Sequence, residues 1–237
     1  MNTIITISKR EFTAYFTTPI AYVYLVTFLA LINWLFFRGF FLMGQADLRS
    51  FFAITPWIFL FFVPAVAMGK WAEERKQGTL ELLFTLPIRD RDLIFGKFFG
   101  SLGLIVAALL FTLPIALTAE LLGNLDWGPV IGGYVGLTFL GGAFLAIGLA
   151  ISSLTENQII AFIGGVLACF VLYFLGSPLF SWGSGLIAQA MQYASLATHF
   201  ESIERGVLDT RDIFYYLSVI GLALFANVKV LESWARK

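Results

Sequence analysis

The chain carries little charge. It has 15 Lys and Arg and 15 Asp and Glu among 237 residues, so 13% of the residues are charged and the formal net charge is zero. A soluble domain usually carries about 25% charged residues. The low charge argues against a soluble fold, and the zero net charge gives no support to nucleic-acid binding, which needs a basic surface.

Cysteine, histidine and the usual enzyme motifs are also scarce. The one cysteine, Cys169, cannot form an internal disulfide and lies in an apolar run, which favours a buried structural thiol. The one histidine, His199, has no second His or Cys near it in the sequence, and a metal site needs three or four ligands. No phosphate-binding loop and no catalytic set of side chains occurs. We therefore expect no catalytic residues, metal or cofactor.

Apolar residues are abundant instead. They make up 59% of the chain, Phe contributes 26 residues, and the mean hydropathy is +0.87. About 20 mostly apolar residues are needed to cross a bilayer. Six stretches approach that length, and the last of them is the shortest: 20–37, 51–68, 98–121, 130–151, 159–175 and 213–228. These stretches predict an all-α integral membrane protein with a single domain over residues 1–237 and with its first apolar run retained as a span.

Proline and glycine occur inside several of these stretches. Pro56 and Pro64 lie in the second stretch and Pro114 in the third. Neighbouring groups can satisfy the carbonyls that proline frees, so we expect kinks rather than breaks. Glycine pairs in the fourth and fifth stretches should permit close contact between helices in lipid. They are Gly132-Gly133, Gly141-Gly142 and Gly164-Gly165.

The basic residues predict the orientation, because cytoplasmic segments carry an excess of Lys and Arg. Eleven of the 15 fall on one side, together with both chain ends: Lys9, Arg10, Lys70, Arg75, Lys76, Arg89, Arg91, Lys97, Lys229, Arg236 and Lys237. The other four are Arg38, Arg49, Arg205 and Arg211. We therefore expect both ends in the cytoplasm.

The inner loop over residues 69–97 is the most informative segment. A charged, helix-favouring part should extend the second span as far as Gly78, a plausible break. A short helix should open at Thr79 and end at Pro87. Its apolar residues are Leu80, Leu82, Leu83 and Phe84. A plain solvated loop explains the charges, whereas an apolar cluster in water favours a docking surface for a partner.

The order and spacing of residues in this loop resemble those of type-two ABC exporter permeases. The matching motifs are Glu73-Glu74-Arg75, Gly78-Thr79, Glu81-Leu82-Leu83, Leu86-Pro87 and Gly96-Lys97. In that family the loop carries the coupling helix, which sits in a cleft of a separate ATP-hydrolysing subunit. The resemblance implies a docking set of Glu73, Glu74, Arg75, Gly78, Thr79, Leu80, Glu81, Leu82, Leu83, Phe84 and Pro87. Residues 199–212 and the Tyr-Tyr-Leu-Ser at 215–218 look like the gliding-motility-associated subgroup.

Two further inner segments fit the same resemblance. Residues 1–19 have apolar positions at three- and four-residue steps around Lys9, Arg10, Glu11 and Phe12, as in an interfacial helix. The family has a gate helix there, and a simple membrane anchor is the alternative. The turn at residues 152–158, with Thr155, Glu156 and Asn157, resembles a second contact with the ATPase, and a plain connecting turn is the alternative.

The outer segment over residues 176–212 is too long for a simple turn. Residues 186, 187, 190, 191 and 194 fall on one helical face, so part of the segment should form a helix at the outer leaflet. The family has re-entrant helices there that close the exit of the transport path. A cap that seals a permease dimer is the alternative.

The resemblance implies the membrane-spanning permease subunit of an ABC transporter in a bacterial inner membrane, with export as the expected direction. Implied partners are two copies of an ATPase, a second permease copy or a sibling permease, a possible auxiliary membrane or periplasmic protein, and the bilayer. An ion-coupled transporter would need paired broken helices, which the sequence lacks. A scaffold or mechanotransmission subunit would share the topology without needing the coupling loop.

Overall fold

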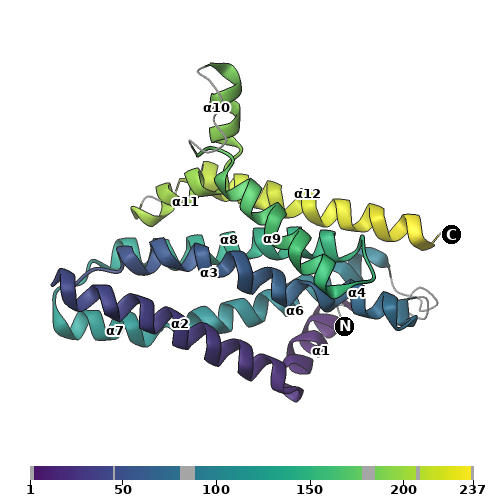
Figure 1. Cartoon of the computed structure of the whole chain (residues 1–237), viewed down its shortest axis with the longest axis horizontal. Coiled ribbons are helices and arrows are strands. Elements are labelled where there is room, and N and C mark those ends of the chain that lie inside the picture. Colours follow the sequence, from purple (N-terminus) through teal and green to yellow (C-terminus); the bar gives the residue numbers. More distant parts are fainter. Residues whose placement is uncertain (1–2, 45, 81–88, 178–184, 207–208, 236–237) are drawn as a thin grey trace.

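The computed structural model describes residues 3–44, 46–80, 89–177, 185–206 and 209–235, and within these ranges every regular element is a helix. The helices lie mostly along one long axis (Figure 1). Their bounds are α1 Thr3–Thr17, α2 Pro19–Met43, α3 Arg49–Ala67, α4 Gly69–Lys76, α6 Asp90–Leu110, α7 Leu113–Leu122, α8 Trp127–Ser152, α9 Gln158–Phe174, α10 Leu186–Tyr193, α11 Leu196–Glu204 and α12 Thr210–Ala235. The predicted all-α class is confirmed.

Five helical segments in the described ranges are long and apolar enough to cross a membrane: Pro19–Leu42, Arg49–Lys76, Asp90–Leu122, Trp127–Ser152 and Thr210–Trp234. The sixth crossing is the shorter α9, whose 17 residues extend about 26 Å, close to the thickness of the hydrocarbon core. Both termini and α4 lie at the same end of the bundle (Figure 1), so the chain must traverse it an even number of times. We call this end the α4 end.

The expectation that the last span is the shortest was wrong. The last span, α12, has 26 residues, whereas the fifth, α9, has 17. Polar residues occur near both ends of α12, including Asp212 and Lys229. The hydropathy pattern predicted only the apolar centre of this span, because hydropathy does not show whether a helix continues through polar residues.

The prolines act in two ways. Pro56 and Pro64 lie inside α3, which continues unbroken to Ala67 and is joined to α4 by Met68 in helical conformation. Before Pro114 the helix is interrupted at Phe111 and Thr112. The Thr112 hydroxyl and the Thr112 amide both donate to the Leu109 carbonyl, at 2.6 Å and 3.0 Å. Phe111 and Thr112 both keep right-handed helical dihedral angles, so the third span continues through an irregular turn as one segment, Asp90–Leu122.

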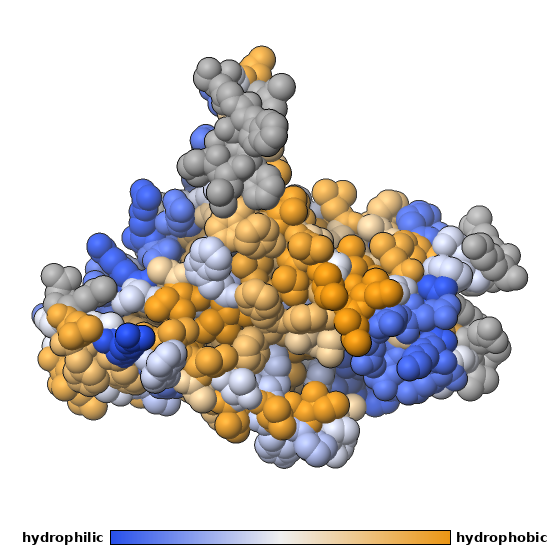
Figure 2. Space-filling view, in the orientation of Figure 1, coloured by the Kyte–Doolittle hydropathy of each residue, from blue (hydrophilic) through white to orange (hydrophobic). Residues whose placement is uncertain are grey.

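Helix α8 is the centre of the bundle and packs on α3, α6, α9, α11 and α12. Its glycines allow the close approach, as predicted: a Cβ at Gly133 would lie 2.5 Å from the Phe52 ring, and one at Gly141 would lie 3.1 Å from Phe59. Apolar side chains cover the middle of the visible face, and hydrophilic side chains gather at the α4 end (Figure 2). This is the surface of a multi-pass membrane protein.

Candidate functional site at the α4 end of the bundle

The described part of the predicted docking loop is an extension of a membrane span. Glu73, Glu74 and Arg75 lie on α4, and the predicted break is confirmed, because Gly78 has a left-handed φ of 70° that favours glycine. The Thr79 hydroxyl donates to the Glu74 carbonyl at 3.0 Å. Leu80 is only 6% exposed, so its side chain belongs to the core. The predicted residues Glu81, Leu82, Leu83, Phe84 and Pro87 lie outside the described residues.

The predicted N-terminal helix is α1, which runs across the end of the bundle rather than along it (Figure 1). Lys9 and Arg10 are exposed and Phe12 is half-buried beside Phe16, with 5.1 Å between ring centroids. Glu11 is 8% exposed and faces inward. The helix is therefore amphipathic in an unusual sense, since its buried face contains an ionised side chain.

Glycines on α6 bring α1 unusually close. A Cβ at Gly96 would lie 2.5 Å from the Ile7 side chain, one at Gly100 would lie 2.6 Å from Glu11 Cβ, and one at Gly103 would lie 2.9 Å from the Phe12 ring. A Cβ at any of these positions would force a neighbouring atom to shift, and at Gly100 that neighbour includes the backbone oxygen of Ser8 at 2.9 Å. The Gly96 of the loop motif is thus part of the α1–α6 contact.

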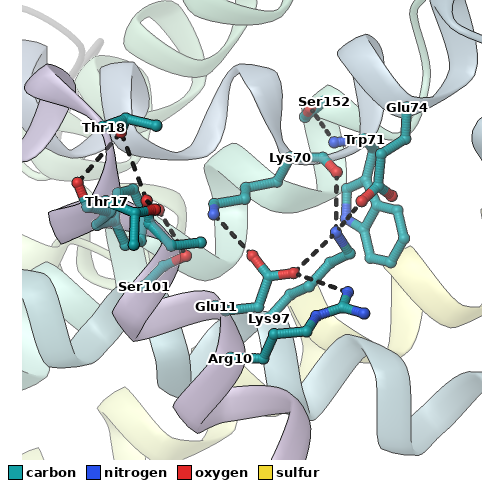
Figure 3. A network of polar contacts seen from close by, with 12 residues as sticks. Arg10, Glu11, Thr17, Thr18, Lys70, Trp71, Glu74, Lys97, Ser101 and Ser152 are labelled. Atoms are coloured by element: carbon teal, nitrogen blue, oxygen red, sulfur yellow. Dashed lines mark hydrogen bonds and ion pairs between the residues drawn. The ribbon is translucent and has the colours of Figure 1, made fainter.

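A buried ionic cluster joins α1, α4 and α6 (Figure 3). One oxygen of Glu11 accepts from Lys70 Nζ at 2.8 Å, and the other lies 3.5 Å from Lys97 Nζ. Lys97 also pairs closely with Glu74 and donates to the Lys70 carbonyl at 3.3 Å. The Lys97 side chain is 1% exposed. We call Glu11, Lys70, Glu74 and Lys97 the four-residue cluster.

The cluster holds Glu11 ionised. Burial acts to raise the Glu11 pKa, but the charges of Lys97 and Lys70 outweigh it and lower this pKa from 4.5 to about 2. A lowered pKa means that the ionised form stabilises the fold, by about 3 kcal/mol for a shift of this size. This contribution is complete above pH 4.5 and is lost as the pH falls toward 2.

Aromatic and hydroxyl groups surround the cluster. Lys70 Nζ lies 4.0 Å from the centre of the Tyr15 ring, and the Tyr15 hydroxyl is 3.0 Å from the Ser101 hydroxyl on α6. The Ser152 hydroxyl, at the end of α8, donates to the Met68 carbonyl at 2.8 Å where α3 passes into α4. The central helix is thereby attached to the base of α4.

A second polar contact brings together the two predicted inner loops and the end of the last span. Arg75 of α4 pairs with Glu156 at 2.8 Å, and its guanidinium lies 3.4 Å from the Trp234 ring centre on α12. Asn157 caps α9 by accepting from the Ile159 amide at 2.9 Å, and Thr155 accepts from the Asn157 amide at 3.1 Å. Of the three predicted residues, Glu156 forms the ion pair with α4, whereas Thr155 and Asn157 accept hydrogen bonds within the turn and at the start of α9.

Sequence reasoning missed several members of this site. Lys70 and Lys97 were used for orientation and motif, and Tyr15, Trp71 and Ser152 were given no role. The sequence did offer one signal for a buried ion pair: Lys97 directly precedes an apolar stretch. A charge near the membrane is costly unless it is paired. Lys70 and its partner Glu11 are 59 residues apart, and no local pattern specifies such a pair.

The outer segment forms α10 and α11, as the predicted helical face required. In Figure 1, α10 projects sideways from the bundle while α11 lies against it. His199 on α11 is 6% exposed: Nδ1 lies 2.6 Å from Asp212 Oδ1, and Nε2 lies 2.9 Å from the Tyr193 carbonyl. A carbonyl can only accept, so Nε2 is the donor. His199 thus ties α10 and α11 to the start of α12.

Replacing His199 by Phe should weaken the attachment of α10 and α11 to the start of α12. Phe keeps a ring stacked on Tyr215, which lies 3.8 Å away between centroids, but removes both hydrogen bonds and leaves the buried Asp212 unpaired. The expected loss is about 1–3 kcal/mol. Amide hydrogen exchange over residues 194–204 should be at least about fivefold faster. The exposed Arg211→Ala serves as the control, and unchanged exchange in His199→Phe would contradict the assignment.

Comparison with known families identifies the bundle. Residues 38–207, more than two thirds of the chain, match the model of the ABC-2 family transporter proteins. The match extends from the end of α2 through α11 and includes α4. No curated protein matches the chain. The matched region contains four of the crossings, the α4 extension and the outer helices, so this chain belongs to the ABC-2 transporter family and is a membrane permease component of an ABC transporter.

Proposed function

We propose that this chain is the export permease of a complex with a separate ATPase, and that the α4 end faces the cytoplasm of a bacterial inner membrane. The observation that supports this most directly is the four-residue cluster. It joins α4, which leads into the docking loop, to α1 and α6 through buried charges. A loop that only connected two spans would need no such network.

Movement of the loop would pass directly into the bundle. α3 and α4 together form one 28-residue helical segment, so a push on the chain beyond Gly78 acts along a membrane span. The Glu11 and Lys97 contacts make α1 and α6 follow α4, and the Arg75 contacts with Glu156 and Trp234 add α12 and the second inner loop. ATP-driven closure of the ATPase would then shift four helices together.

The complex should contain two ATPase copies and two permeases. An ATPase dimer presents two equivalent clefts, and closed twofold symmetry is the usual solution for such a pair. Either a second copy of this chain or a sibling permease would fill the second position, with an auxiliary membrane or periplasmic protein as an optional addition. We also propose that the chain belongs to the gliding-motility-associated subgroup of these permeases.

Replacing Leu82 and Leu83 by Asp should weaken the complex with the ATPase. Two buried apolar anchors at an interface contribute more than about 1 kcal/mol each, so affinity should fall roughly thirtyfold. The measurement is co-purification of the proposed ATPase partner with the tagged chain, followed by titration of the reconstituted complex. The double change Leu82→Met and Leu83→Met preserves apolar volume and is the control.

Two outcomes separate the alternatives. If the Asp variant still binds the ATPase, the loop is not the docking site. The alternative is a subunit that transmits force. It would be favoured if the Asp variant loses binding and the unchanged complex hydrolyses ATP in sealed vesicles without moving any cargo. Glu74→Ala should lower the ATP hydrolysis that is coupled to transport, because it removes the carboxylate that joins α4 to Lys97 of α6.

A further inference from the structure

The His199 ring has a hydrogen-bond acceptor at each of its two nitrogens. Nε2 lies 2.9 Å from the Tyr193 carbonyl oxygen, which can only accept. Nδ1 lies 2.6 Å from Oδ1 of Asp212, and an ionised carboxylate also only accepts. A neutral imidazole has one N–H, so it can donate to one of these oxygens and would turn a lone pair toward the other. The geometry therefore requires a second proton, between Nδ1 and Oδ1.

The burial of Asp212 supports the same requirement. Asp212 is 6% exposed, and its one ion pair with the described residues is the pair with His199. A buried carboxylate without a cationic partner is costly. A free histidine keeps its proton up to about pH 6.5, whereas a free aspartate binds one only below about pH 3.9, so the shared proton belongs on the imidazole. The pair is then an imidazolium and a carboxylate.

The other titratable groups around this ring come from three helices. Tyr193 of α10 and Tyr215 of α12 face the ring, with 5.3 Å and 3.8 Å between centroids, and tyrosine ionises only near pH 10. Helices α8 and α9, which also pack on α11, contain no charged residue in their described ranges. On α11 itself, burial raises the pKa of Glu204. Glu204 is therefore the group whose effect must be separated from that of His199.

His199 connects three helices at their ends. It lies on α11 and contacts Tyr193, the last residue of α10, and Asp212, in the first turn of α12. The Tyr215 hydroxyl strengthens the same junction by donating to the Ala194 carbonyl at 2.7 Å. We propose that His199 and Asp212 form a proton-dependent latch. The latch holds α10 and α11 on α12 while the shared proton is bound, and it weakens when that proton leaves.

The direction of the pH effect follows from the number of bound protons. The closed latch keeps a proton on the pair, whereas the separated residues keep it only below about pH 6.5. Above that pH the latch must take up a proton in order to close, so it weakens as the pH rises. The ratio of open to closed latch should increase about tenfold between pH 5.5 and 7.5, and about a hundredfold between pH 5.5 and 8.5.

The latch requires neither an ATPase nor transport, so it and the proposed function can fail independently. His199 is the one histidine of the chain, which permits a direct test. The purified full-length chain, with an affinity tag free of histidine, is labelled with 15N at histidine only. Both ring nitrogens should carry a proton at pH 7.5, where about nine tenths of free histidine is neutral. A ring nitrogen without a proton at this pH would overturn the proposal.

Hydrogen exchange measures the latch itself. The protection of residues 194–204, relative to the exchange rate of an unstructured chain at each pH, should fall about tenfold between pH 5.5 and 7.5. Asp212→Asn should remove this dependence, because the amide can donate to Nδ1 of a neutral ring and no extra proton is needed. Glu204→Gln is the matched control, since it neutralises a carboxylate on the same helix, and it should keep the dependence.

Three results of this comparison would also overturn the proposal. Protection that does not change between pH 5.5 and 7.5 in the parent chain would mean that closing takes up no proton. A pH dependence that survives in Asp212→Asn would mean that the carboxylate does not hold the proton. A dependence that disappears in Glu204→Gln would assign the effect to Glu204 instead.

Discussion

Replacing Lys97 by Met should destabilise the folded chain by about 3 kcal/mol, because it removes the common partner of the buried Glu11 and of the partly buried Glu74. Lys97 is 1% exposed and lies against both Glu11 and Glu74. Met has a similar length and shape, so the loss comes from charge rather than from a cavity. A change of 3 kcal/mol corresponds to a more than hundredfold larger unfolded fraction.

The chain carries its own reporter for this measurement. Cys169 is the one cysteine and is 0% exposed, so a thiol reagent labels it only after the bundle opens. Labelling in a denaturant series should begin at a much lower concentration in Lys97→Met than in the parent chain. Lys229→Met is the control, because Lys229 is 57% exposed in its pair with Glu232 and such pairs contribute about 0.5 kcal/mol. Equal shifts in both variants would mean that the buried cluster contributes no more than a surface pair.

The change Gly100→Ala should separate α1 from α6. The added Cβ would lie 2.6 Å from Glu11 Cβ and 2.9 Å from the Ser8 carbonyl oxygen, which is a backbone atom of α1. A flexible side chain could move aside, but here the whole of α1 must shift. The expected cost is about 1–3 kcal/mol, and the displacement also pulls Glu11 away from its lysines.

Labelling of Cys169 and protease sensitivity of residues 3–17 together measure this effect. Gly221→Ala is the matched control, since nothing lies within 4 Å of a Cβ at that position of α12. Alanine is the better helix former, so Gly221→Ala should be neutral or slightly stabilising. A loss of stability of the same size in both variants would show that α1 does not need close contact with α6.

The sites that matter most depend on pairs distant in the sequence. The hydrogen bond between Lys70 and Glu11 joins residues 59 apart, and that between Tyr15 and Ser101 joins residues 86 apart. The outer histidine is similar in kind, because its partner Asp212 follows 13 residues later, on another helix. Glu11 was expected in the polar part of an interfacial helix, but it faces inward, beside Gly100 and paired with Lys70 and Lys97. Leu80, expected in an apolar cluster for docking, is covered by the bundle itself.

Hydropathy and the placement of charges were sufficient to predict the membrane class, most span positions and the location of both termini at one end. The reason is that the free energy of transferring each residue from water to lipid is nearly local and additive. The order of residues in the loop was sufficient for the family. The length of α12, the interruption before Pro114 and the four-residue cluster were decided only by the tertiary structure. Each depends on which helices pass close enough to satisfy a buried polar group, and that proximity is a property of the assembled bundle rather than of any single segment.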